Sequence, residues 1–278
     1  MDPAHESPYY TGQRFTPVAA VLRATLDGHE FFFNPLEHNA ETEHAGLASE
    51  FDLVTQPPGH AGAADGEGFV KVGVGVLKKK GQNYAFWSAY EVITPAKTSV
   101  EWGEDSATFK QTCEGAGGYA YELGAEVKVT ADQVSVDWTL KNTGTKPLST
   151  DNYVHNFFRF DDKSVGPNYV VSFPYDFEAE GLGEEQEQKG REVHFTKEIP
   201  KFINAKVPVP EGYDGENAFT VKHTKTGQSL AGLSSLPSKE VALHATKSNV
   251  CPEQFIHIEV APGKEATWRR SYTFSVEK

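Results

Sequence analysis

The chain has 278 residues, with 38% hydrophobic and 12% aromatic residues, 25 glycines and 16 prolines. This composition is that of a folded protein, and the many turn-forming residues favour an all-β protein that forms a single domain over residues 1–278. The formal net charge of −13 argues against binding to nucleic acid or to an anionic membrane surface, and no apolar run is long enough to cross a membrane.

The first ten residues lack the basic start and the apolar stretch of a signal peptide. We therefore expect the protein to be cytoplasmic, or secreted with the signal peptide already removed. Cys113 and Cys251 are the only cysteines. They are either two reduced, buried thiols or one disulfide, and their spacing does not decide between these states.

The first predicted strands lie in residues 13–33, where Asp27-Gly28 is a hairpin-type dipeptide. Residues 34–65 are predicted to form a long irregular loop, of the kind that often serves as a lid or a binding loop. Its polar residues match no metal-ligand spacing, so we interpret them as solvated and expect no metal site. The residues concerned are His38, His44, Glu50 and His60.

Residues 66–80 read as a strand with Val70, Val72, Val74 and Val76 on one face. Glycines leave the other face nearly bare around Lys71. Such glycines indicate close approach either by a ligand or by a neighbouring strand. We take Lys71 as a candidate hydrogen-bond donor to a substrate.

Several more strands are predicted from Tyr84 to Leu140 and beyond residue 168. In residues 133–142, Val134, Val136 and Trp138 share one face, and a turn follows at Asn142. No alternation of strands with helices and no convincing helical period is present, so a parallel α/β sheet is excluded. Walker loops, dinucleotide fingerprints and GxSxG elbows are also absent.

The stretch DNYVHNFFRFDD, residues 151–162, carries the chemistry. Strict alternation places Tyr153, His155 and Arg159 on one face of a strand, while the other face is mostly apolar. Polar groups fixed on a strand beside aromatic rings are what a sugar pocket needs. A single histidine in an aromatic strand is, however, more often a hydrogen-bonded structural residue. Near the C-terminus, a strand pair is joined at Pro262-Gly263, and His257 and Glu259 share one face of it.

Three segments together resemble the galactose mutarotase (aldose 1-epimerase) superfamily. VHNFFRF resembles its H-x-Y-F-N-L segment, and VCPEQF before Pro262-Gly263 resembles its late strand with a catalytic glutamate. Residues 68–78 lie where the family has a basic, sugar-binding stretch. The resemblance implies an antiparallel β-supersandwich and an aldose 1-epimerase-like isomerase that needs no cofactor.

By this resemblance, His155 corresponds to the acid that protonates the ring oxygen, and Glu253 to the base that removes the anomeric hydroxyl proton. Glu259 is the reserve candidate for the base. The remaining candidates bind substrate hydroxyls, namely Lys71, Tyr153, Arg159 and His257. The expected partner is a small carbohydrate or related ring compound, and the expected assembly is a monomer or a homodimer.

The sequence departs from the family at two places. The Leu-His-Gly-Gly segment is absent, and Val70-Lys71-Val72-Gly73 replaces a Gly-Arg…Asn-Arg pattern. Two alternatives therefore stay open. One is a carbon–oxygen lyase acting on a uronic acid or glycoside, with Lys71, Tyr153 and Arg159 as its polar groups. The other is a carbohydrate-binding domain without turnover.

Overall fold

The computed structural model describes residues 9–35, 38–238 and 240–277, and these residues form antiparallel strands and connecting loops. The all-β antiparallel class predicted from the sequence is confirmed. No helix in the described ranges could cross a membrane. Residues 1–8, which carry most of the N-terminal stretch used for the localisation prediction, lie outside the described residues.

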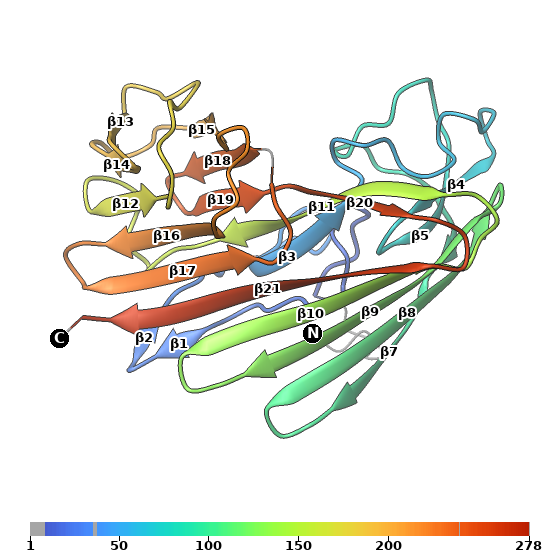
Figure 1. Cartoon of the computed structure of the whole chain (residues 1–278), viewed down its shortest axis with the longest axis horizontal. Coiled ribbons are helices and arrows are strands. Elements are labelled where there is room, and N and C mark those ends of the chain that lie inside the picture. The colour runs from blue at the N-terminus through green and yellow to red at the C-terminus, as the bar shows by residue number, and fades with distance from the viewer. Residues whose placement is uncertain (1–8, 36–37, 239, 278) are drawn as a thin grey trace.

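One ten-stranded sheet runs the length of the molecule (Figure 1). In spatial order its strands are β13 (Gln186–Lys189), β14 (Glu192–Phe195), β12 (Tyr169–Ser172), β16 (Asn217–His223), β17 (Gln228–Ser234), β21 (Glu265–Val276), β10 (Gln133–Asn142), β9 (Tyr119–Val129), β8 (Ser106–Ala116) and β7 (Lys97–Trp102).

Three smaller sheets cover one side of the large sheet, with one at each end and one between them (Figure 1). The middle sheet has the order β20 (Ile256–Val260), β11 (Leu148–Phe157), β3 (Gly46–Phe51). The end sheets are β15 (Phe202–Pro208), β18 (Glu240–Thr246), β19 (Val250–Gln254) and β4 (Gly68–Lys71), β5 (Gly75–Lys78), β6 (Val92–Pro95). A separate hairpin consists of β1 (Thr25–Leu26) and β2 (His29–Glu30).

Apolar side chains from both layers fill the space between the sheets. Along β10, Val134, Val136 and Trp138 are buried, as their alternation predicts. Trp138 lies opposite Trp268 of β21, and the two indoles stack with centroids 5.8 Å apart and planes at 5°. Phe51 of β3 meets both rings edge-on at 6.2 Å, which ties the middle sheet to the large one.

The prediction of an irregular loop over residues 34–65 missed a strand. Residues 46–51 form β3, whose six residues are all buried and which pairs with β11. A strand covered on both faces has no polar alternation, so its sequence, GLASEF, carries no period-two signal. His44, Glu50 and His60 are buried, so the interpretation of these residues as solvated was wrong. Residues 36–37 of this segment lie outside the described residues.

Residues 66–80 form the hairpin β4–β5 rather than one strand. Gly73 adopts a φ of 84° in the turn, and a Cβ atom there would lie 2.6 Å from Cβ of Thr16. The close approach of Thr16, from an earlier part of the same chain, therefore accounts for this glycine. The predicted hairpin turn at Asp27-Gly28 is confirmed between β1 and β2, with φ values of 51° and 83°. Both cysteines are free and buried.

Candidate active site

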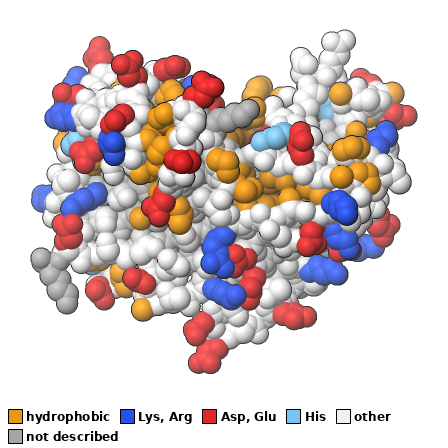
Figure 2. Space-filling view, in the orientation of Figure 1, with side chains coloured by type: hydrophobic (Ala, Val, Ile, Leu, Met, Phe, Trp, Pro, Cys, Tyr) orange, Lys and Arg blue, Asp and Glu red, His pale blue; other side chains and the backbone are white. Residues whose placement is uncertain are grey.

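Strand pairing gathers polar side chains on one face of the middle sheet. Directly opposed residues of an antiparallel pair point to the same face. Tyr153 of β11 lies opposite Glu50 of β3, and Asp151 lies opposite His257 of β20. His155 follows two residues after Tyr153 and shares that face. Figure 2 shows the molecular surface hollowed between two raised ends, and Figure 1 places the middle sheet below this hollow.

Two of the predicted catalytic residues meet at this face. Glu253 comes from β19, in the sheet at one end, and its Oε1 atom lies 3.4 Å from Nε2 of His155. Each side chain is 9% exposed. Nδ1 of His155 and Oε1 of Glu253 have no hydrogen-bond partner among the described residues. The two groups are therefore in contact without a hydrogen bond between them, and they are held by packing.

The surroundings of His155 are aromatic. Its ring stacks on Phe157 with centroids 4.1 Å apart, and Phe15 meets it edge-on at 5.9 Å. The His244 ring lies 5.7 Å away. Burial lowers the pKa of His155 well below its ordinary value, and the positive charge of Arg14 acts in the same direction.

The pKa of Glu253 shifts in the opposite direction. Burial raises the pKa of Glu253 to about 8, although the charge of Arg14 opposes this rise. At neutral pH the imidazole of His155 is therefore unprotonated and the carboxyl group of Glu253 holds a proton. A carboxylic acid facing a neutral imidazole is an acid–base pair with both partners in the state needed for proton transfer.

Arg14 organises the neighbouring polar groups. Its Nε donates to Oε2 of Glu50 at 2.7 Å, and its Nη2 donates to the hydroxyl of Tyr153 at 2.7 Å. The Tyr153 hydroxyl in turn donates to Glu50. The guanidinium lies over the rings of Phe15 and Phe86, with its Cζ 4.7 and 4.5 Å from their centroids. These contacts fix a cation beside the His155–Glu253 pair.

A second buried cation lies behind Glu50. Lys71 has no exposed surface, and its Nζ lies 3.7 Å from Oε1 of Glu50 and donates to the carbonyl of Phe51. Asp52 accepts from Oγ1 of Thr150 at 2.6 Å and from the backbone N of Val72 at 2.9 Å. Burial raises the pKa of Asp52 to about 7, against the effect of Lys71. Lys71 therefore gives the Glu50 carboxylate a second cationic contact besides Arg14.

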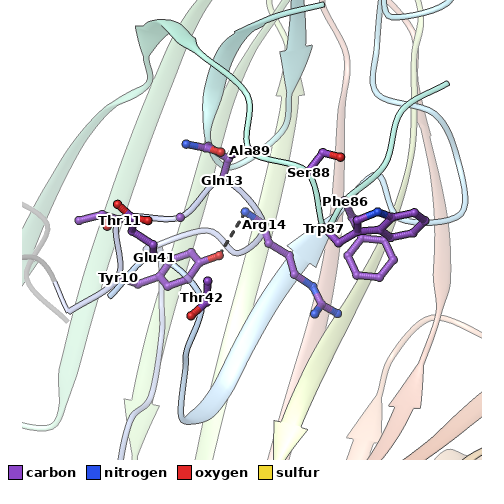
Figure 3. Close-up of a pocket in the computed structure, with 11 residues that line it drawn as sticks. Tyr10, Thr11, Gln13, Arg14, Glu41, Thr42, Phe86, Trp87, Ser88 and Ala89 are labelled. Atoms are coloured by element: carbon purple, nitrogen blue, oxygen red, sulfur yellow. Dashed lines mark hydrogen bonds between the residues drawn. The ribbon is translucent and has the colours of Figure 1, made fainter. Parts of the chain in front are cut away.

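A cavity of about 380 Å³ adjoins Arg14 (Figure 3). It is enclosed by residues 10–14, 41–42 and 86–89. Trp87 on its rim is 76% exposed, and Phe86 meets the indole edge-on at 4.9 Å. We call this pocket the Arg14 cavity. Aromatic faces beside polar groups suit a hydroxyl-rich ring.

No family model matches the sequence, and no curated protein matches it. Solved structures do match. A galactose mutarotase related enzyme from Lactobacillus acidophilus has a TM-score of 0.58 at 10% identity, covering 92% of each chain. A putative aldose 1-epimerase from Escherichia coli K12 has a TM-score of 0.54 at 14% identity, covering 93% of this chain and 99% of that one. The chain has the galactose mutarotase-like fold.

Within the galactose mutarotase-like fold, several predicted residues lie away from the pair. Glu259, the reserve base, is 76% exposed and contacts His257 instead, at 3.2 Å. Its strand partner Ser149 lies six residues from His155 along β11, about 20 Å at roughly 3.4 Å per residue. Arg159 lies beyond the end of β11 and donates to the carbonyl of Asp162.

The predicted substrate-binding set is also revised. Tyr153 and Lys71 are fully buried and engaged with Glu50, so they position that carboxylate and do not present a donor to the surface. β11 stops at Phe157, but the predicted alternation continues past it, with Phe158 and Phe160 buried and Arg159 half-buried.

Two residues of the site were missed by sequence reasoning. Glu50 was noted, but it was assigned to a solvated loop because β3 lacks alternation. Arg14 lies in an irregular segment before β1, where no local pattern marks it.

Proposed function

We propose that this protein is an isomerase that interconverts the α and β anomers of an aldose or a related cyclic hemiacetal. The observation that carries the proposal is the placement of Nε2 of His155 3.4 Å from Oε1 of Glu253, where the middle sheet meets one of the end sheets. The two oxygens of a hemiacetal that exchange protons are both bonded to the anomeric carbon. A pair of acid and base groups this close can therefore serve both oxygens of one ring.

The reaction is a proton exchange. One group takes the proton of the anomeric hydroxyl while the other delivers a proton to the ring oxygen, and the bond between the ring oxygen and the anomeric carbon breaks. Rotation about the adjacent carbon–carbon bond turns the aldehyde, and the ring closes with the two roles reversed. Each positioned group increases the reaction rate on the order of 10²- to 10⁴-fold.

The starting roles follow from the protonation states. The resemblance assigned the acid to His155 and the base to Glu253. The raised pKa of Glu253 and the lowered pKa of His155 favour the reverse at the start of a turnover, with Glu253 as acid and His155 as base. The total number of protons on the pair is the same in both assignments, and the steps need only these side chains.

Polarimetry or exchange NMR on freshly dissolved sugars tests the proposal. We expect faster approach to anomeric equilibrium with at least one aldose in a broad panel, and loss of this acceleration in His155→Ala and in Glu253→Gln. Absence of acceleration across the panel, or an undiminished rate in His155→Ala, would contradict it.

The two alternatives make different predictions. A lyase would release an unsaturated product that absorbs in the ultraviolet, but its proposed groups Lys71 and Tyr153 are buried and Arg159 lies beyond the end of β11. A binding domain without turnover would retain sugar binding in Glu253→Gln by titration calorimetry and show no anomer exchange in either form. The close acid–base pair favours the isomerase over both.

A further inference from the structure

The Arg14 cavity begins beside the acid–base pair. Arg14 lines the cavity and bonds to Tyr153, which lies two residues from His155 on the same face of β11, about 7 Å away at roughly 3.4 Å per residue. Phe15, the next residue along the chain, touches the His155 ring. The cavity therefore lies one residue along the chain from the aromatic contact of His155, although neither His155 nor Glu253 lines it.

The shape of the cavity favours a ring-sized group. Trp87 lies in a turn closed by a 2.9 Å bond from the backbone N of Ser88 to the carbonyl of Ala85. This turn holds Phe86 beneath it, over the Arg14 guanidinium, while most of the indole is exposed (Figure 3). At about 380 Å³ the cavity is at the lower end of the roughly 300–1,000 Å³ range of small-molecule sites.

The charges of the cavity favour a neutral ligand. Arg14 supplies one positive charge, which is already paired with Glu50, and Glu41 supplies a carboxylate on the opposite side. The other polar side chains are uncharged, from Tyr10, Thr11, Gln13, Thr42 and Ser88. Amide and hydroxyl groups next to an open aromatic face recognise hydroxyl groups and the apolar side of a pyranose.

We propose that the Arg14 cavity binds the second sugar unit of a neutral reducing disaccharide or longer oligosaccharide, with Trp87 as its stacking surface. The reducing-end unit then lies at His155 and Glu253. This inference rests on the proposed function for the identity of the reacting ring, but the cavity itself can be tested independently of turnover.

The kinetic test compares substrates of one and two rings. Anomer exchange is measured for glucose, maltose and cellobiose with the wild-type protein, with Trp87→Ala and with Trp102→Ala. Trp102 is the matched control because it is 60% exposed and lies on β7, the edge strand of the large sheet, which Figure 1 shows well away from the middle sheet. We expect Trp87→Ala to lower kcat/KM for at least one disaccharide roughly three- to tenfold, as loss of one aromatic contact does, and to leave glucose unchanged.

The binding test uses methyl maltoside and methyl cellobioside, which cannot open. Titration calorimetry should show that both glycosides bind the wild-type protein and Trp102→Ala, and that binding is lost or strongly weakened in Trp87→Ala. If no sugar is turned over and this Trp87-dependent binding is still seen, the proposed isomerase fails while the subsite stands. Equal effects of Trp87→Ala on glucose and both disaccharides, or glycoside binding that does not depend on Trp87, would overturn the subsite.

Discussion

His155 and Glu253 face each other from two different sheets, with Nε2 of the imidazole 3.4 Å from Oε1 of the carboxyl group. Each side chain keeps a polar atom without a hydrogen bond, because Nδ1 of His155 and Oε1 of Glu253 have no partner among the described residues. Buried polar groups are usually paired, so these unpartnered atoms, together with the shifted pKa values of both groups, mark the pair as a candidate functional site.

Removal of either partner should abolish most of the anomer exchange. We expect His155→Ala and Glu253→Gln each to lower kcat on the order of 10²- to 10⁴-fold, because each removes one of the two proton-transfer groups. Glu259→Gln is the control, since this carboxylate is exposed and paired with His257. Polarimetry measures all three variants. A large loss in Glu259→Gln with an active Glu253→Gln would move the role of the carboxyl group from Glu253 to Glu259.

The rate should depend on pH in a bell shape. Activity needs one proton on the pair, so it should fall above pH about 8 as Glu253 loses its proton, and fall at acid pH, well below 6.5, as His155 gains one. We expect the residual activity of Glu253→Gln to lack the alkaline limb. A profile that is flat through pH 8 in the wild-type protein would contradict this assignment.

Arg14 should set the position of this pH profile. Its charge lowers the pKa of both His155 and Glu253, so Arg14→Met should move the acid limb and the alkaline limb to higher pH. The same measurement on Arg191→Met provides the control, because Arg191 pairs with Asp176 on the surface. Limbs that stay in place in Arg14→Met would show that Arg14 acts only through packing.

Loss of the buried lysine should destabilise the fold. Lys71→Met leaves the fully buried Glu50 with Arg14 as its remaining cation, and breaking a buried ion pair costs about 3–5 kcal/mol. Denaturant unfolding should show a loss near the lower end of this range, and Lys71→Met with Glu50→Gln should recover part of it. Lys97→Met, which removes an exposed pair with Glu114, should leave the free energy of unfolding unchanged.

Asp52 should make stability decrease with rising pH. Its pKa is raised from 3.8 to about 7 in the folded protein, so the folded state binds the proton more tightly than the unfolded state does. Stability is then lost as pH rises from about 4 to 7, by at most about 4 kcal/mol at about 1.4 kcal/mol per pKa unit. Asp52→Asn removes this titratable group, and asparagine tolerates the positive φ of 57° at this position. The pH dependence of its unfolding free energy should therefore be flatter than that of the wild-type protein.

Sequence patterns predicted the fold well where one face of a strand is exposed. The alternation in β10 placed Val134 and Trp138 in the core, and the Asp27-Gly28 dipeptide marked its hairpin. The same logic failed for β3, because a strand buried on both faces shows no alternation. At the end of β11 the alternation also held, because Phe158 still bridges Phe32 and Val250 and burial alternates as far as Phe160.

The site was partly predictable for a related reason. His155 and Glu253 were found because each lies in a recognisable strand segment that resembles a known family. Arg14 and Glu50 meet only through tertiary packing between an irregular segment and a fully buried strand, and no local period encodes that meeting. Lys71 was identified as important, but its role is set by burial beneath Glu50, which sequence spacing does not reveal.

The stacked indoles of Trp138 and Trp268 give the molecule a built-in optical reporter. Two chromophores 5.8 Å apart and nearly parallel couple their excited states, so their circular dichroism reports the register between β10 and β21. The other two tryptophans, Trp87 and Trp102, are largely open to solvent. A water-soluble quencher such as iodide should therefore quench the emission of Trp87 and Trp102 only. Ligand binding at the Arg14 cavity and unfolding of the core around Trp138 and Trp268 can then be followed separately in one sample.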